Sequence, residues 1–252
     1  MNFFKLENNL IEGRTIIHLM GFKFKFINKK LIHRLNYNVS LSRIFSKYNN
    51  QEKIRVGFLV SDNCKWNSEV LYELLEESNI FEPIILVTLY DTRHSKKDLT
   101  KPTISENYEF FVKKGKRVAK AYDEEKAEYI NLNKFNIDIL FYQQPWGVVP
   151  IQGLEEVSHY ALCCYIPYGI SLMDCNVEVR PFHEKLFAYF IPNETTKEIL
   201  MKYKINELNN LIIVGYPKLD IYKKIKKTHI TKTKKTIIYA PHHSYNRGLK
   251  IG

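Results

Sequence analysis

The stretch IRVGFLV, residues 54–60, decides the fold class of this chain. It is an almost unbroken apolar run, which is typical of a parallel β-strand covered on both faces. The polar residues SDNCKWN (61–67) follow, and then a segment through residue 78 with apolar side chains at helical spacing. The pattern predicts a strand, a turn and a helix. The side chains expected to point inward are Trp66, Val70, Leu71, Leu74 and Leu75.

The same unit recurs along the chain. Further strands are predicted at about 82–90, 137–143 and 161–166, and within KLFAYFIP (185–192) and NLIIVGYP (210–217). Helices are predicted at about 104–121, within EEVSHY (155–160) and at NETTKEILMKY (193–203), the last capped by Asn193. Strands that alternate with connections of helix length favour a parallel sheet with right-handed crossovers. We therefore expect an α/β fold with a doubly wound parallel sheet, a Rossmann-like domain at residues 53–217.

Positive charge is concentrated at the two ends of the chain, whose formal net charge is +11. Residues 1–53 hold ten Lys/Arg and three Asp/Glu, and residues 218–252 hold ten and one, so the middle is slightly acidic. A nucleic-acid binder is expected to carry a basic stripe on its folded body. No nucleic-acid partner is therefore expected, and the basic ends suit anionic lipid, nucleotide phosphates or solubility.

Residues 1–52 are predicted to form a basic, aromatic N-terminal arm. GFKFKFINKK (21–30) alternates apolar and basic residues, as a short strand or hairpin would, and KKLIHRLNYNVSLSRIF (29–45) fits a basic amphipathic helix. Such a segment can lie in a membrane interface, or it can pack on the domain with solvated lysines. No apolar run of about 18 residues predicts a membrane span, and a signal peptide is not expected.

Four cysteines are present without a C-x-x-C pair or a histidine at zinc spacing. They are expected to be buried structural thiols in a reducing, cytoplasmic compartment, and no metal or cofactor is predicted. The two neighbours in the apolar run 161–166 should point to opposite faces of a strand. The four are Cys64, Cys163, Cys164 and Cys175.

Ligands of open parallel sheets bind beyond the carboxyl ends of the strands, near the point where strand order reverses. This rule selects the loop SDNCKWNSE (61–69), which places Asp62, Asn63, Lys65 and Asn67 at a helix start. Exposed N–H groups there attract anions, although Asp and Asn are also ordinary helix caps. No G-x-G-x-x-G or P-loop pattern is present, so neither a dinucleotide site nor a P-loop is predicted.

Two further loops are candidates by the same rule. FYQQPWG (141–147) offers Gln143, Gln144 and Trp146 for hydrogen-bonding and stacking on a sugar, or else forms a turn around a buried tryptophan. YIPYGI (165–170) would let a ligand approach the backbone closely at Gly169, beside Tyr168, unless Pro and Gly merely end the strand.

Other ionisable residues lack a partner in the sequence. Asp138 and Asp174 are more often turn or surface acids than a general base. His159 and His183 are expected to be partly buried or exposed helix and loop residues.

The C-terminal part changes character after GYPKLD (215–220). Residues 218–235 are predicted as a basic linker with a short helix, and residues 236–252 as one strand, at about 236–240, of an incomplete second domain. Adjacent histidines on an extended chain point apart, so His242 and His243 should not share a metal. One imidazole with Ser244 would suit a phosphate, or the segment is a plain turn.

These segments together resemble the CDP-glycerol glycerophosphotransferase family and related two-domain GT-B transferases of surface polysaccharide synthesis. Gly215, Tyr216, Pro217 and Asp220 match the family's "GYPRxD"-like segment, and "APHH" (240–243) matches the strand-loop that opens its donor-binding domain. The likeness covers about residues 53–245. It implies a donor phosphate site at Gly215, Tyr216, His242, His243 and Ser244, and acceptor-side loops at Asp62, Asn63, Lys65, Gln143, Gln144, Trp146 and Gly169.

By the same resemblance, Tyr168 stands where many family members carry the histidine of an "HGTP" segment that would act as catalytic base, and Gly169 matches its glycine. A phenol, with a pKa of about 10, is a poor base at neutral pH.

The resemblance implies transfer from a nucleotide-activated donor, CDP-glycerol or a CDP- or UDP-sugar, to a lipid-linked or polysaccharide acceptor in capsule or lipooligosaccharide synthesis. The expected place is the cytoplasm, with peripheral contact to the inner membrane and its anionic surface as a further expectation. Because the sequence supplies one strand of the donor domain, weak or absent activity is expected. The alternative is a non-catalytic α/β scaffold that binds membrane or a partner donor domain.

Overall fold

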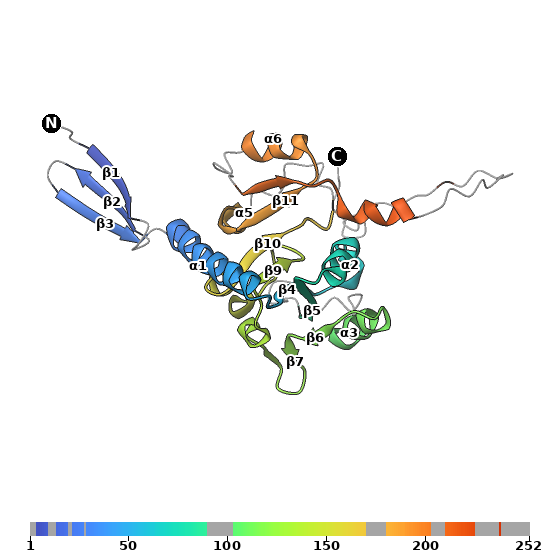
Figure 1. The fold of residues 1–252 in the computed structure, drawn as a ribbon. Coiled ribbons are helices and arrows are strands. Elements are labelled where there is room, and N and C mark those ends of the chain that lie inside the picture. The colour runs from blue at the N-terminus through green and yellow to red at the C-terminus, as the bar shows by residue number, and fades with distance from the viewer. Residues whose placement is uncertain are drawn as a thin grey trace, which may run out of the picture.

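The computed structural model describes residues 4–9, 14–19, 22–27, 29–89, 103–169, 180–202, 210–224 and 237. Its centre is a seven-stranded, all-parallel sheet with the order β12-β11-β10-β9-β4-β5-β6 (Figure 1). The doubly wound parallel sheet expected from the sequence is confirmed. Its strands are β4 (Ile54–Val60), β5 (Phe81–Val87), β6 (Val118–Lys120), β9 (Ile139–Tyr142), β10 (Leu162–Tyr165), β11 (Ala188–Ile191) and β12 (Leu211–Ile213).

The strand order reverses once. From β4 the chain adds β5 and β6 on one side, then returns to place β9 on the other side of β4 and continues outward. This is the order of Rossmann-type sheets, in which ligands bind in the crevice between the two strands where the order reverses. The expected ligand edge is therefore the carboxyl end of β4 and β9.

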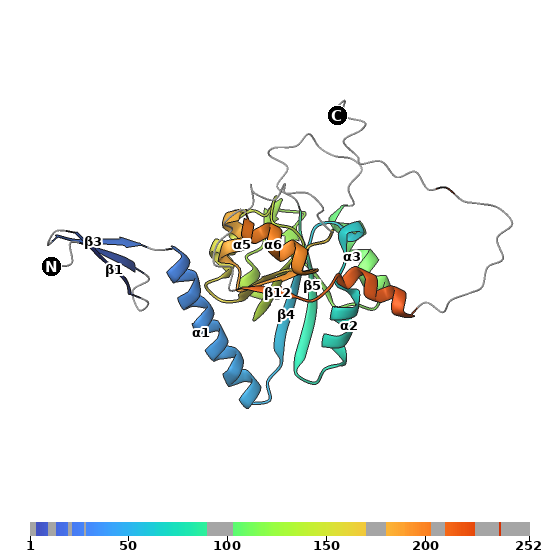
Figure 2. The ribbon, with the colours of Figure 1, turned by 90° about the horizontal axis from the view of Figure 1, so that it is seen from above.

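Helices cover both faces of the sheet, and α1 and α2 lie on opposite sides of β4 (Figure 2). Side chains of β4 alternate between two cores, with Phe58 packing toward Tyr72 and Phe111, and Leu59 packing toward Tyr37 and Leu154. The helices are α1 (Lys29–Asn49), α2 (Glu69–Glu77), α3 (Ile104–Lys113), α4 (Leu154–Val157), α5 (Arg180–Lys185) and α6 (Glu194–Lys202), with 3-10 turns η1 (Asn63–Lys65), η2 (Leu132–Phe135), η3 (Pro150–Gln152) and η5 (Pro217–Lys224).

The N-terminal arm contains a three-stranded antiparallel sheet followed by α1. Within the described residues α1 packs on the parallel sheet, where its residues His33, Tyr37 and Ser40 are buried. The Tyr37 hydroxyl donates to the Lys185 carbonyl at 2.7 Å. Small antiparallel strands complete the description: β1 (Phe4–Asn9), β2 (Arg14–Leu19) and β3 (Phe22–Ile27) in the arm, and β7 (Tyr122–Asp123) with β8 (Glu128–Tyr129).

The predicted helix 104–121 is wrong in its second half. Helix α3 ends at Lys113, and Gly115 adopts a φ of +72°, a left-handed conformation that suits glycine and ends helices. Residues 118–120 then pair with β5 as the edge strand β6. Within α3, Phe111 is buried and the next residue, Val112, is exposed.

Three other local predictions are corrected. Trp66 precedes α2, and Leu74 is 60% exposed, because a helix that begins at Glu69 turns Tyr72 toward the sheet instead. Cys64 is exposed, whereas Cys163 and Cys164 are buried. Asp138 is not a surface acid: it is 1% exposed at the start of β9.

His183 is more deeply buried than expected, at 1% exposure, and its ring stacks on Tyr189 with centroids 4.7 Å apart. Its Nδ1 has no hydrogen-bond partner in the part of the chain that is described. Burial lowers the pKa of His183 to about 4. The folded protein therefore holds this imidazole neutral.

This buried histidine should make the protein less stable in mild acid. In the unfolded chain this histidine has a pKa of about 6.5 and is protonated below that pH, whereas in the folded chain it stays neutral down to about pH 4. The free energy of unfolding therefore falls as the pH drops from about 6.5 to about 4. Between about pH 7 and pH 5 we expect this residue to contribute a loss of about 2 kcal/mol. Urea denaturation of His183→Phe, which keeps an aromatic ring against Tyr189, should show a correspondingly smaller loss. Equal losses in both proteins would contradict a neutral, buried His183.

Candidate functional site

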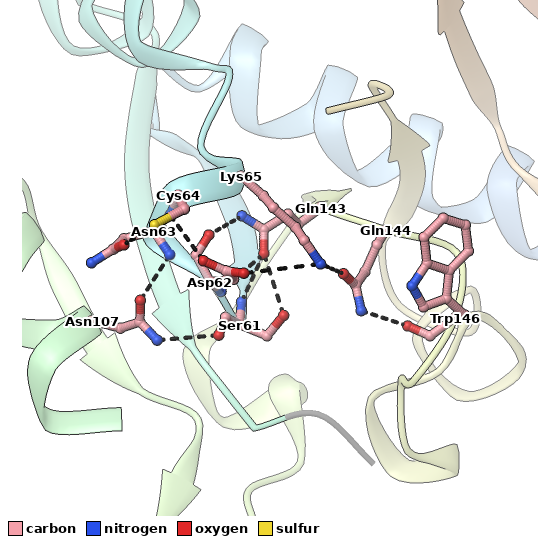
Figure 3. Close-up of polar contacts among 9 residues, drawn as sticks. All are labelled: Ser61, Asp62, Asn63, Cys64, Lys65, Asn107, Gln143, Gln144 and Trp146. Atoms are coloured by element: carbon pink, nitrogen blue, oxygen red, sulfur yellow. Dashed lines mark hydrogen bonds and ion pairs between the residues drawn. The ribbon is translucent and has the colours of Figure 1, made fainter. Parts of the chain in front are cut away.

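The candidate site lies at the carboxyl ends of β4 and β9, where the strand order reverses. Residues 61–65 leave β4 there, and residues 143–146 leave β9, so two of the loops selected from the sequence meet (Figure 3). The third loop follows β10, the next strand outward.

The Gln143 side chain occupies the centre of this junction. Its Oε1 accepts hydrogen bonds from the backbone N–H groups of Ser61 and Asp62, at 3.0 and 3.1 Å. Its Nε2 donates to the Asp62 carbonyl at 2.7 Å. In Rossmann folds the N–H groups of this first turn bind phosphate. Here the protein's own amide oxygen takes that place.

The remaining N–H groups of the loop also donate within the protein. Asp62 Oδ1 accepts from the Cys64 N–H at 2.9 Å and so caps η1. The Asn63 N–H donates at 2.8 Å to Asn107 of α3, whose Nδ2 returns a bond to the Ser61 carbonyl. Asn107 was not identified from the sequence, because it lies mid-helix and far away in the chain. This loop is a capped, internally bonded turn rather than an open anion cradle.

Polar and aromatic groups gather on the rim beside this junction. Lys65 Nζ lies 3.3 Å from Gln144 Oε1, 3.9 Å from Asp62 Oδ2 and 5.1 Å from the centre of the Tyr168 ring. The Trp146 and Tyr168 rings meet edge to face, with centroids 6.1 Å apart. Trp146 is 41% exposed, so the alternative of a buried tryptophan is wrong.

Tyr168 is suited to donate a hydrogen bond rather than to remove a proton. Partial burial, with the Asp62 charge nearby, raises the pKa of its hydroxyl. The phenol is therefore protonated at neutral pH and cannot act there as a general base.

Hydrogen bonds from two sides hold the loop that carries Tyr168. The buried Asn67 donates from its Nδ2 to the Pro167 carbonyl at 2.7 Å. The Tyr216 hydroxyl donates to the Tyr168 carbonyl at 2.6 Å. Gly215, with a φ of +82°, turns the chain just before Tyr216. The segment after β12 is thereby joined to the candidate site.

Two small cavities at this edge are lined by described residues. One lies among Ser61, Thr88 and Gln143, the other among Trp66, Asn67 and Ile166, and each has a volume of about 10 Å³. That is close to the space one water needs. A larger ligand fits neither of these two cavities, whereas Trp146 and Gly169 are exposed on the rim.

The buried thiols are not candidate nucleophiles. Burial raises the pKa of Cys163 to about 12 and also raises the pKa of Cys164, so both are protonated at neutral pH. Within the described ranges, no group of His, Cys, Asp and Glu could hold a metal ion, and no helix has the length and apolar character to cross a bilayer.

Several predicted residues lie outside the described residues: Asp174, Cys175 and the C-terminal strand-loop with His242, His243 and Ser244. The chain matches no protein-family model and no curated protein.

Proposed function

We propose that this chain is the acceptor-side part of a GT-B-type glycosyl- or glycerophosphotransferase of surface polysaccharide synthesis. The observation that carries the proposal is the 2.6 Å hydrogen bond from the Tyr216 hydroxyl to the Tyr168 carbonyl. It joins the GYPKLD segment (215–220) to the YIPYGI loop (165–170), two of the segments on which the family resemblance rests. In a two-domain transferase, such a link would connect the interdomain segment to the acceptor loops.

The position of Gln143 supports an acceptor role for this sheet. Because its Oε1 already accepts from the Ser61 and Asp62 N–H groups, a nucleotide phosphate has no free donors at the first turn. The donor, CDP-glycerol or a CDP- or UDP-sugar, would then be bound elsewhere. The rim formed by Lys65, Gln144 and Trp146 would face a lipid-linked or polysaccharide acceptor.

In this proposal Asp62, not Tyr168, accepts the proton of the acceptor hydroxyl. The phenol is protonated at neutral pH because its pKa is raised. Asp62 Oδ1 is used for capping, while Oδ2 lies 3.9 Å from Lys65 on the rim side. A carboxylate within reach of the acceptor is a competent general base.

Two binding measurements test this function. Isothermal titration with CDP, CDP-glycerol and UDP-sugars should show no micromolar binding to this chain, and micromolar binding of CDP would contradict an acceptor-side assignment. In flotation assays, vesicles that contain a lipid-linked oligosaccharide acceptor should retain more protein than plain vesicles of equal charge. Equal retention would count against acceptor recognition.

The second candidate is a non-catalytic scaffold that docks on membrane or on a partner donor domain. It is favoured by α1, whose outer side exposes Phe45 (62%) and Tyr48 (54%), and by the exposed Lys23 and Lys25 of β3. Aromatic and basic residues together suit an anionic lipid surface. Flotation that depends on anionic lipid and salt, with no effect of the acceptor, would favour this candidate.

A further inference from the structure

Trp146 and Tyr168 form an aromatic shelf whose polar side-chain atoms bond to no other residue that the structure describes. Among the described residues, neither the Trp146 indole Nε1 nor the Tyr168 hydroxyl has a hydrogen-bond partner. The other tryptophan behaves differently: Trp66 Nε1 donates to Glu69 at 2.6 Å. An exposed indole combines apolar surface with a donor that water satisfies until a ligand replaces it, and such residues are common in binding sites.

Two polar groups lie beside the shelf. Gln144 is only 4% exposed, and its Nε2 donates to the Trp146 carbonyl at 2.8 Å. Its Oε1 lies 3.3 Å from Lys65 Nζ, which in turn sits 5.1 Å from the Tyr168 ring centre. An amide, an ammonium group and two aromatic rings therefore converge on one rim.

We infer that this shelf binds a pyranose ring of the acceptor. One face of a pyranose presents C–H groups, which pack on an aromatic ring, while its hydroxyls both donate and accept hydrogen bonds. The indole N–H, the Tyr168 hydroxyl and Lys65 can bond those hydroxyls. This inference rests on the proposed function, since it names the chemical class of the acceptor.

The shelf is held in place before any ligand binds. Asn67 and Tyr216 hold the carbonyls of Pro167 and Tyr168, at 2.7 and 2.6 Å. Gln144 holds the carbonyl of Trp146. Little ordering is then needed on binding, which favours measurable affinity for a small ligand.

The two tryptophans make a direct test feasible. The ¹⁵N-labelled full chain should give two indole N–H cross-peaks, because the sequence has two tryptophans. Methyl pyranosides of glucose, galactose and N-acetylglucosamine are titrated to millimolar concentrations. We expect at least one to shift the Trp146 peak saturably, while the Trp66 peak stays in place. Trp146→Ala assigns the peaks by removing one.

Variants tie the binding to the shelf. Trp146→Ala should weaken pyranoside binding, followed by saturation-transfer NMR, at least tenfold, and Tyr168→Phe about threefold. Tyr48→Ala, which removes an exposed aromatic residue from α1, is the matched control and should bind as the parent does. Unchanged binding by Trp146→Ala, or no shift with any pyranoside, would overturn the inference.

Glycerol 3-phosphate separates this inference from the proposed function. If it shifts the Trp146 peak and no pyranoside does, the acceptor is not a sugar at this shelf, but the transferase proposal stands. If pyranosides bind and acceptor-bearing vesicles fail to retain the protein, the shelf is a sugar site and the transferase proposal fails.

Discussion

Replacing Asp138 by alanine is expected to lower the free energy of unfolding by about 3 kcal/mol. The carboxylate is buried at the start of β9 and accepts from Lys47 Nζ at 2.7 and 2.9 Å and from the Arg55 N–H at 2.9 Å. Arg43 Nε lies 3.4 Å away. Alanine would leave a partly buried ammonium group and a backbone N–H without their acceptor, and it would release the end of α1.

Urea denaturation measures this loss. Asp138→Asn keeps an acceptor for the Arg55 N–H, so it should lose less than alanine does. The matched surface control is Glu109→Ala, whose partner Lys113 is 4.0 Å away in an exposed pair, and it should change stability by at most about 0.5 kcal/mol. If Asp138→Ala and Glu109→Ala lose the same amount, α1 is not anchored through Asp138.

Replacing Gln143 by leucine is expected to cost about 2–4 kcal/mol. The amide satisfies the N–H groups of Ser61 and Asp62 and the Asp62 carbonyl, and leucine can replace none of these bonds. Buried polar groups without partners are expensive, and here they would face a small cavity.

Gln143→Glu distinguishes hydrogen bonding from packing. Its carboxylate can still accept from the two N–H groups but cannot donate to the Asp62 carbonyl, so an intermediate loss is expected in urea denaturation. A Gln143→Leu protein as stable as the parent would show that these bonds do not hold the junction together.

The order of strands and helices could be predicted because it depends on local pattern. The apolar run 54–60 became β4, and Asn193 caps α6, where its Oδ1 accepts from the Thr196 N–H at 2.8 Å. Prediction failed where a distant contact overrides that pattern. Residues 118–120 belong to a strand because β5 has an open edge beside them, and no local signal reports that edge.

The candidate site was predicted in part for the same reason. Asp62, Lys65, Gln144 and Trp146 could be selected because they follow strands, and parallel strands end at one edge of the sheet. Asn107 and Asn67 could not be selected for their roles, since each acts through bonds to residues distant in sequence.

The sequence by itself determined the α/β alternation and the edge on which polar loops gather, because apolar periodicity and strand direction are local properties. Only the tertiary structure decided which side chains meet there. The Gln143 side chain accepts from the backbone N–H groups of the turn after β4. On the rim, Lys65 contacts Gln144, and Tyr168 contacts Trp146. These contacts form because β9 lies beside β4, and that pairing joins residues about eighty positions apart, which no local sequence pattern encodes.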